Sequence, residues 1–193
     1  MEQTQSVYQT KVFIALGSNI GDKISNIKQS IHEIKKYGKV VNYGDIYISK
    51  PYGFKNQQNF FNTAILFLTN LQPMDLIKKL SLIETKLKKN KKIENGPRKI
   101  DIDIIFYGKQ NVSNKKLTIP HPRAHLRDFV LRPISDIDSN FIHPTKKISI
   151  RNLISQLDEN FISRSFDILI IKCSRVCEFE FSIFSFRYFV IDE

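Results

Sequence analysis

The sequence predicts an α+β fold of the ferredoxin-like class, a βαββαβ domain in which helices pack on one face of an antiparallel sheet. Between residues 11 and 107 the apolar periodicity changes in the order strand, helix, strand, strand, helix, strand. Each helical segment carries a single apolar stripe. With 193 residues, of which 41% are hydrophobic, the chain can form one complete core. We expect a domain over residues 1–159 and a C-terminal extension over residues 160–193.

The first strand and helix follow from residues 11–38. "KVFIALGSN" is a short apolar strand that ends in the turn formers GSN. In "GDKISNIKQSIHEIKKYG" isoleucines recur at helical spacing, at Ile24, Ile27, Ile31 and Ile34. We expect Asp22 to cap the N-terminus of this helix and Gly38 to end it.

The later elements are predicted from the same signals. "VVNYGDIYIS" and "FFNTAILFLT" are strands, separated by a loop of turn formers. "QPMDLIKKLSLIETKLKK" is a helix with Pro73 in its first turn and its stripe at Leu76, Leu80, Ile83 and Leu87. The last strand lies in "KIDIDIIFYG". The turn-rich segment "KKLTIPHPRAHLRDFVLRPISDI" leads to a short helix, and "SIRNLISQL" is a further predicted helix. Within the extension, "CEFEFSIFSFRYFVIDE" alternates as a strand does.

Two acidic residues stand out in the last of these strands. Asp101 and Asp103 are two positions apart in an extended chain, so both carboxylates lie on one face. Neighbouring carboxylates repel, and they must share a proton, pair with bases or bind a cation. Mg²⁺ is commonly held by one or two carboxylates together with substrate phosphates. The alternative is that the adjacent lysines neutralise the pair.

The net charge of +11 favours a polyanionic partner such as a nucleic acid or ATP. Much of it falls in "KLKKNKKIENGPRK", which is alternatively a solvated basic loop. No segment is long and apolar enough for a membrane span, and the first ten residues do not have the pattern of a signal peptide. We expect a cytoplasmic protein that does not bind a membrane and whose Cys173 and Cys177 are free thiols.

Two further segments carry candidate binding residues. "IPHPRAHLRDF" supplies imidazole and guanidinium groups that suit a triphosphate, although surface decoration is the simpler interpretation of each residue alone. "NQQNFFNTA" places Asn59 and Asn62 beside Phe60 and Phe61, so that an amide can bind the edge of a flat heterocycle while a ring stacks on its face. The phenylalanines are alternatively core residues.

Five strings in order resemble the 6-hydroxymethyl-7,8-dihydropterin pyrophosphokinase (HPPK) family of folate biosynthesis. They are "IALGSNIGD", "NFFNTA", "IE" at Ile83-Glu84, "NGPRKIDIDIIFYG" and "LTIPHPRAHLRDFVLRPISDI", followed by "HP" at His143-Pro144. The resemblance covers residues 11–157. It implies transfer of pyrophosphate from ATP to the hydroxymethyl group of the pterin, with release of AMP and with two Mg²⁺ ions on Asp101 and Asp103.

The resemblance also implies roles for individual residues. The pterin site corresponds to Ser49, Tyr52, Phe60, Asn62 and Phe129, and the ATP site to Glu84, Lys89, Ile104, Lys116, Thr118 and His121. Arg98 and Arg127 join the aspartates as catalytic residues. The loops over residues 49–58 and 86–98 match two mobile loops of the family. The implied partners are these small molecules, not nucleic acid, with association with dihydropteroate synthase as a further expectation.

The chain departs from the family pattern at several positions. Ser49 replaces a common threonine, Lys88-Lys89 replaces Gly-Arg, and Asn95 stands where some members have tryptophan. Because lysine does not have the planar fork of arginine, we expect a weaker phosphate clamp in this loop.

Two other functions stay open at this point. One is a basic ferredoxin-like module that binds nucleic acid, although the aromatic "K/R-G-F/Y" string of such modules is absent. The other is a D-x-D nucleotidyltransferase, which would release pyrophosphate instead of AMP. The extension from about residue 160 is outside the resemblance and is an extra strand, a remnant of a fused synthase or a frameshifted tail.

Overall fold

The computed structural model describes residues 10–87 and 96–166. In chain order the elements are β1 (Thr10–Ser18), α1 (Lys23–Ile34), η1 (Lys35–Tyr37), β2 (Lys39–Tyr43), β3 (Ile46–Ser49), β4 (Phe60–Thr69), α2 (Pro73–Lys86), β5 (Asp101–Tyr107), β6 (Val112–Ser113), β7 (Thr118–Ile119), η2 (Ala124–Leu126), α3 (Asp128–Asp138), α4 (Ile150–Ile154) and β8 (Ile162–Phe166).

The central sheet confirms the predicted class. Its strands follow the order β5-β1-β4-β3-β8, with β2 also paired to β4, and every pairing is antiparallel. The strands of the βαββαβ motif therefore lie in the order expected for a split βαβ fold, with the first strand between the last and the third. A separate two-stranded hairpin is formed by β6 and β7.

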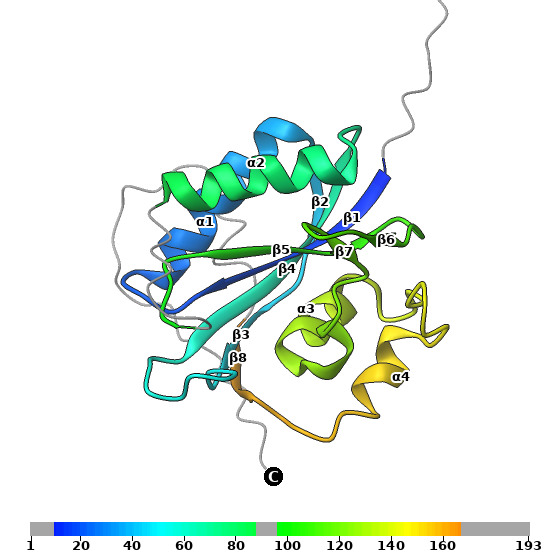
Figure 1. Cartoon of the computed structure of the whole chain (residues 1–193). Coiled ribbons are helices and arrows are strands. Elements are labelled where there is room, and N and C mark those ends of the chain that lie inside the picture. Colours follow the sequence, from blue (N-terminus) through cyan, green and yellow to red (C-terminus); the bar gives the residue numbers. More distant parts are fainter. Residues whose placement is uncertain (1–9, 88–95, 167–193) are drawn as a thin grey trace, which may run out of the picture.

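Helices cover both faces of this sheet (Figure 1). α1 and α2 pack on one face, as predicted, over a core that includes Ile14, Phe67 and Leu80. The prediction of helices on one face only is incomplete, because α3 and α4 cover part of the opposite face and bury Phe13 and Phe106 there. The sheet residues alternate between these two cores.

Local signals fix the helix ends. The Asp22 side chain caps α1 by accepting a hydrogen bond from the Ser25 backbone N–H at 2.9 Å. Pro73 occupies the first turn of α2, where its missing N–H is not needed. The predicted stripe of α2 is buried at Leu76, Leu80 and Ile83.

The segment predicted as one strand over residues 40–49 is divided into β2 and β3. Gly44 lies at the division and its N–H donates to the Ala64 carbonyl oxygen at 2.8 Å. A Cβ at this position would lie 2.1 Å from the Pro133 carbonyl oxygen, so only glycine lets α3 approach the sheet here. α4 is also shorter than its segment predicts.

The first residues of the predicted extension belong to the sheet. β8 pairs with β3 in the register Tyr47↔Ser165 and Ser49↔Ile162. The division at residue 160 stays a prediction, but the polypeptide on its far side contributes an edge strand next to the main domain. The predicted aromatic strand of the tail, Cys173, Cys177 and the basic loop with Lys89 lie outside the described residues.

Candidate active site

A cleft of about 450 Å³ opens on the sheet face that carries α3. It is bounded by the ends of β1, β4 and β5, by the turn before β5, by the loop after β3, and by the segment that leads into α3. Its lining comprises Ala15, Leu16, Gly17, Ser49, Lys50, Tyr52, Phe60, Asn62, Thr63, Gly96, Pro97, Arg98, Asp101, Asp103, His121, Arg123, Arg127, Phe129 and Val130.

Strand register determines which residues lie side by side on the floor of the cleft. Gly17 of β1 pairs with Asp101 of β5 on one side and with Asn62 of β4 on the other. In the next row of the same face, Ala15 lies opposite Asp103. Directly paired residues point to the same face, so both carboxylates and the Asn62 amide face the cleft. With strands about 4.8 Å apart, the acidic strand is about 10 Å from the amide.

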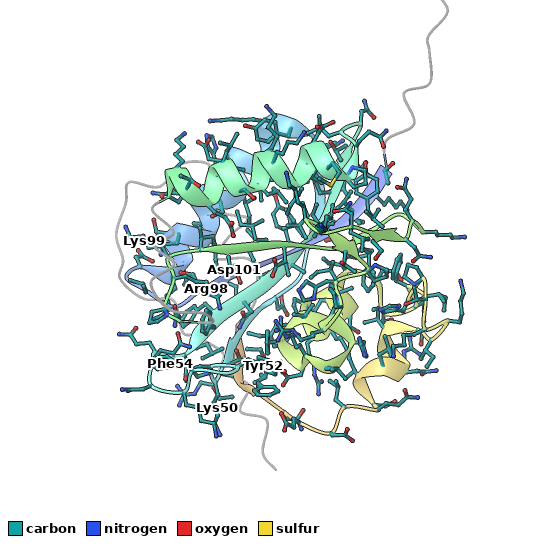
Figure 2. The ribbon with its side chains drawn as sticks, viewed as in Figure 1. Lys50, Tyr52, Phe54, Arg98, Lys99 and Asp101 are labelled. Atoms are coloured by element: carbon teal, nitrogen blue, oxygen red, sulfur yellow. The ribbon has the colours of Figure 1, made fainter. Side chains whose placement is uncertain are left out.

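The turn before β5 places a cation on the first carboxylate. Arg98 Nη1 lies 2.9 Å from Asp101 Oδ2, and both side chains are largely buried. The Arg98 guanidinium also lies 5.5 Å from the ring centroid of Phe60. Its Nε is buried without a hydrogen-bond partner among the described residues. Figure 2 shows Arg98 and Asp101 close together where β5 begins, with Tyr52 and Lys50 in the loop that follows β3.

Asn19, which the sequence analysis did not single out as a site residue, anchors this turn. Its Oδ1 accepts from the Arg98 N–H at 2.8 Å, and its backbone N–H donates to the Arg98 carbonyl oxygen at 3.2 Å. Its Nδ2 donates to Gln57 Oε1 and to the Gln58 carbonyl oxygen. One buried amide thus ties the end of β1 to the turn that carries Arg98 and to the loop over residues 50–58.

The opposite wall is basic. The Arg127 guanidinium lies 4.7 Å from the Tyr52 ring centroid, and that of Arg123 lies 5.8 Å from the same centroid. Burial, and secondarily the charge of Arg123, lowers the pKa of Arg127, although an arginine remains a cation at neutral pH. The Nε of Arg127 is buried without a partner within the described part of the chain. This wall can therefore accept an anion.

His121 lies between the basic wall and the acidic strand. Burial, with the charges of Arg127 and Arg123, lowers the pKa of His121 to about 4, and Asp101 opposes this effect. The ring is neutral at pH 7. Nδ1 accepts from the Arg123 backbone N–H at 3.3 Å, so the proton resides on Nε2.

The third part of the cleft is aromatic. Phe60, Phe129 and Tyr52 line it, together with the amide of Asn62. Asn62 Nδ2 donates to Ser49 Oγ at 2.9 Å, and both side chains are buried. A Cβ added to Gly17 would lie 3.0 Å from Asn62 Oδ1, so the glycine leaves room for the amide.

Ten of the predicted site residues line this one cleft. Four other predicted site residues lie in the described part of the chain but outside the cleft lining. The ten are Ser49, Tyr52, Phe60, Asn62, Arg98, Asp101, Asp103, His121, Arg127 and Phe129.

The four predicted residues outside the lining have other surroundings. The Glu84 carboxylate accepts from the Ile102 N–H at 2.8 Å. The Ile104 side chain is in the core under α1 and α2. Lys116 and Thr118 are exposed in the β6–β7 hairpin. The nucleotide-binding roles of these four residues stay predictions, as does that of Lys89, which is outside the described residues.

Lys50 and Arg123 line the cleft, although the family resemblance assigned neither to the ATP or pterin site. Arg123 is one of the guanidinium groups in "IPHPRAHLRDF" that suit a triphosphate. Arg123 had a local signal, because it precedes Arg127 by four residues in "PHPRAHLR". Lys50 had none, since it is one of many lysines in a lysine-rich chain.

The fold and cleft define a ferredoxin-like α+β protein with one site that combines paired carboxylates, arginines and aromatic rings. The model of the 7,8-dihydro-6-hydroxymethylpterin-pyrophosphokinase (HPPK) family matches residues 13–139. The chain belongs to this family.

Relatives and solved structures agree with this assignment. The chain is 38% identical over 133 residues to 2-amino-4-hydroxy-6-hydroxymethyldihydropteridine pyrophosphokinase of Aquifex aeolicus, covering 69% of this chain and 83% of that protein. It is 38% identical over 163 residues to the Folic acid synthesis protein fol1 of Pneumocystis carinii, covering 84% of this chain but only 22% of that protein. The crystal structure of wild-type Plasmodium falciparum HPPK-DHPS shares the fold, with a TM-score of 0.64 and 16% identity over 77% of this chain and 45% of that one.

The part of the chain that the structure describes contains no helix with the length and apolar character needed to cross a membrane.

Proposed function

We propose that this protein transfers the terminal pyrophosphoryl group of ATP to the hydroxymethyl group of 6-hydroxymethyl-7,8-dihydropterin, giving AMP and the pterin diphosphate. The observation that carries the proposal is the register of the cleft floor, in which Gly17 separates Asp101 from Asn62. This arrangement puts the acidic strand and the amide that can bind a heterocycle within one substrate length of each other. Family membership supports the same reaction.

The acidic strand suits Mg²⁺. Asp101 and Asp103 share one face and line the cleft, and the described residues contain no group of three or more His, Cys, Asp or Glu that could hold a metal alone. The pair would therefore hold the metal together with phosphate oxygens and water, as Mg²⁺ commonly requires. When bound, Mg²⁺ would neutralise phosphate charge and lower the proton affinity of the attacking hydroxyl. Two ions remain our proposal.

The basic groups bind and orient the polyphosphate. Arg127 and Arg123 face the cleft from one wall and Arg98 from the other, and arginine forks suit phosphate oxygens. The buried Nε atoms of Arg98 and Arg127 need acceptors, which a polyphosphate supplies. Neutral His121 donates through Nε2–H without adding a charge that would compete with the metal.

The aromatic groups orient the pterin. Phe60 and Phe129 hold the faces of the ring, and Asn62, fixed by Ser49, binds its edge. The hydroxymethyl group then points along the floor toward the carboxylates. In-line transfer needs no covalent intermediate on the protein, so positioning and electrostatics carry the rate.

The direct test follows AMP after addition of MgATP and 6-hydroxymethyl-7,8-dihydropterin. The parent should form AMP, and Asp101→Asn and Asp103→Asn should each lower kcat by about 10²-fold or more. Asp75→Asn, which removes an exposed carboxylate on α2, is the matched control and should be unchanged. Formation of pyrophosphate instead of AMP would support the nucleotidyltransferase alternative.

The chain spans only 22% of the length of the Pneumocystis carinii and Dictyostelium discoideum relatives. We propose in addition that the protein associates with a dihydropteroate synthase and is located in the cytoplasm.

A further inference from the structure

Asp128, the first residue of α3, is a buried carboxylate that joins two distant segments. It is 1% exposed. Its Oδ1 accepts from the Phe129 N–H at 2.7 Å, and its Oδ2 accepts from the N–H groups of Phe161 and Ile162 at 2.7 and 2.9 Å. An ionised carboxylate only accepts hydrogen bonds, so it can satisfy all three amides with charge-assisted bonds. The start of α3 and the start of β8 are thereby held together.

The Phe161 ring contacts two of the aromatic residues in the cleft. Its centroid lies 5.5 Å from that of Tyr52 and 5.8 Å from that of Phe129, edge to face in both cases. The Phe161 carbonyl oxygen accepts from the Lys50 N–H at 2.8 Å. Phe161 therefore supports, from outside the cleft, the rings that form its aromatic wall.

The strand that follows Phe161 supports the same wall. β8 pairs with β3, and Ser163 Oγ donates to the Ile48 carbonyl oxygen. β3 ends at Ser49, whose hydroxyl accepts from Asn62. The ring contacts and the amide contact of the cleft thus depend on the position of one segment.

We propose that Asp128 is a positioning residue for pterin binding and that it acts through Phe161, which fixes the orientation of Phe129 and Tyr52. This inference rests on the proposed function and names residues that support the pterin end of its site. Rings that are held in place before binding lose less conformational entropy when a ligand stacks on them. Neither Asp128 nor Phe161 lines the cleft.

The first experiment replaces Asp128 in the full chain. Asp128→Asn keeps the size and shape of the side chain but replaces one acceptor oxygen with an NH₂ group. The remaining oxygen can accept either from the α3 amide or from the two amides at the start of β8, but not from both sides. We expect the KM for the pterin to rise about tenfold, with the KM for MgATP and kcat changed by less than about threefold. Asp158→Asn, at an exposed carboxylate just before β8, is the matched control and should match the parent. An equal rise in both KM values, or no rise, would overturn the inference.

The second experiment tests Phe161 by binding alone. Titration calorimetry with 6-hydroxymethylpterin and a non-hydrolysable ATP analogue should give a Kd for the pterin about tenfold weaker in Phe161→Ala and less weakened in Phe161→Leu, which keeps apolar packing. Phe141→Ala removes a ring that contacts Phe13 and Phe106, so it controls for general loss of stability.

The two proposals fail in different ways. Where Asp128→Asn does not fold, the two Phe161 variants decide the question, because a pterin Kd equal to that of the parent in both Phe161→Ala and Phe161→Leu would contradict the proposed role. A parent protein that forms no AMP would remove the proposed function itself. An active parent with unchanged pterin affinity in both Phe161 variants would remove only the positioning role.

Discussion

The same strands present different residues on the two faces of the central sheet. Toward α1 and α2, the strands present a continuous apolar set that includes Ile14 and Ile104. Toward α3, the same strands present Phe13 and Phe106 at one end but Ala15, Gly17 and the two aspartates at the other. One face is a core along its full length, whereas the other is half core and half cleft.

This difference teaches how the cleft is made. Ala15 and Gly17 on β1 have small side chains or none, which leaves open space above this part of the sheet. α3 and α4 pack only against the part where large rings project from the sheet. The charged groups then occupy space that packing leaves open, and the adjoining cores keep them in place. Substitutions in the cleft should therefore change activity with little effect on stability, and substitutions in the α1/α2 core should do the reverse.

The largest expected effect is the loss of activity in Arg127→Leu. Removing a cation that lines the cleft, where we propose that the polyphosphate binds, should lower kcat/KM by about 10²- to 10³-fold. The free energy of unfolding should fall by less than about 1 kcal/mol, because the charge is half-buried and its removal relieves a desolvation cost. Steady-state kinetics and urea unfolding measure the two quantities. Arg151→Leu, at an exposed position of α4, is the control. A large loss of stability with kcat/KM preserved would contradict the division between the two faces.

The converse change is Leu80→Ala in the α1/α2 core. Leu80 is fully buried, so its truncation should lower the free energy of unfolding by about 3 kcal/mol. At a temperature where the protein is folded, KM for both substrates should match the parent. Leu82→Ala, on the same helix but 60% exposed, should change stability by less than about 0.5 kcal/mol. Equal destabilisation by the two leucine variants would show that the α1/α2 face is not a tight core.

The sequence predicts the locally determined parts of this architecture well. Asp22 caps α1 through a bond to a residue three positions away, and the Asp101/Asp103 pattern follows from strand periodicity alone. Asn19 was missed because its main partner, Arg98, is 79 residues away. A hydrogen bond of that kind has no period or motif in the sequence.

The same reason explains the boundary at the extension. The pairing of β8 with β3 joins segments more than a hundred residues apart, and only the three-dimensional position of Asp128 shows why Phe161 is held there. Family resemblance ended near the boundary, so it gave no help. Conversely, resemblance gave Lys116 and Thr118 a role that the geometry of the cleft does not provide by itself.

Gly17→Ala tests the small residues on which the cleft depends. The new Cβ would lie 3.0 Å from Asn62 Oδ1 and would push the amide away from its bond to Ser49. We expect the KM for the pterin to rise about tenfold, while stability falls by about 1 kcal/mol. The KM for MgATP is the internal control. An unchanged pterin KM would mean that the floor has room to spare, and that Gly17 does not set the depth of the cleft.

The smallest effect concerns the two histidines whose pKa is lowered to about 4, His121 in the cleft and His143 in the core half of the same face. Burial is the main cause for both, and His125 and Lys146 add to it at His143. His143 Nδ1 accepts from the N–H groups of Thr145 and Lys146, which requires an unprotonated nitrogen.

The sign of the pH dependence follows from these positions. An unfolded histidine titrates near 6.5, so between pH 6.5 and 4 the unfolded chain takes up protons that the native protein does not, and stability falls as the pH falls through this window. At pH 7 an unfolded histidine is only about one quarter protonated and the native one is not, so the contribution falls to about 0.2 kcal/mol. His121→Gln and His143→Gln should each reduce the loss of stability between pH 7 and 5 by about 1 kcal/mol. Urea unfolding at the two pH values measures this.

Activity separates the two histidines. His121→Gln should also raise the KM for MgATP, because the Nε2–H donor in the cleft is displaced, whereas His143→Gln should leave both KM values at the parent level. Acid sensitivity that persists in both variants would assign the effect to other groups. A rise in the KM for MgATP in His143→Gln would show that the core half of this face is coupled to the cleft, so that the two halves do not have separate roles.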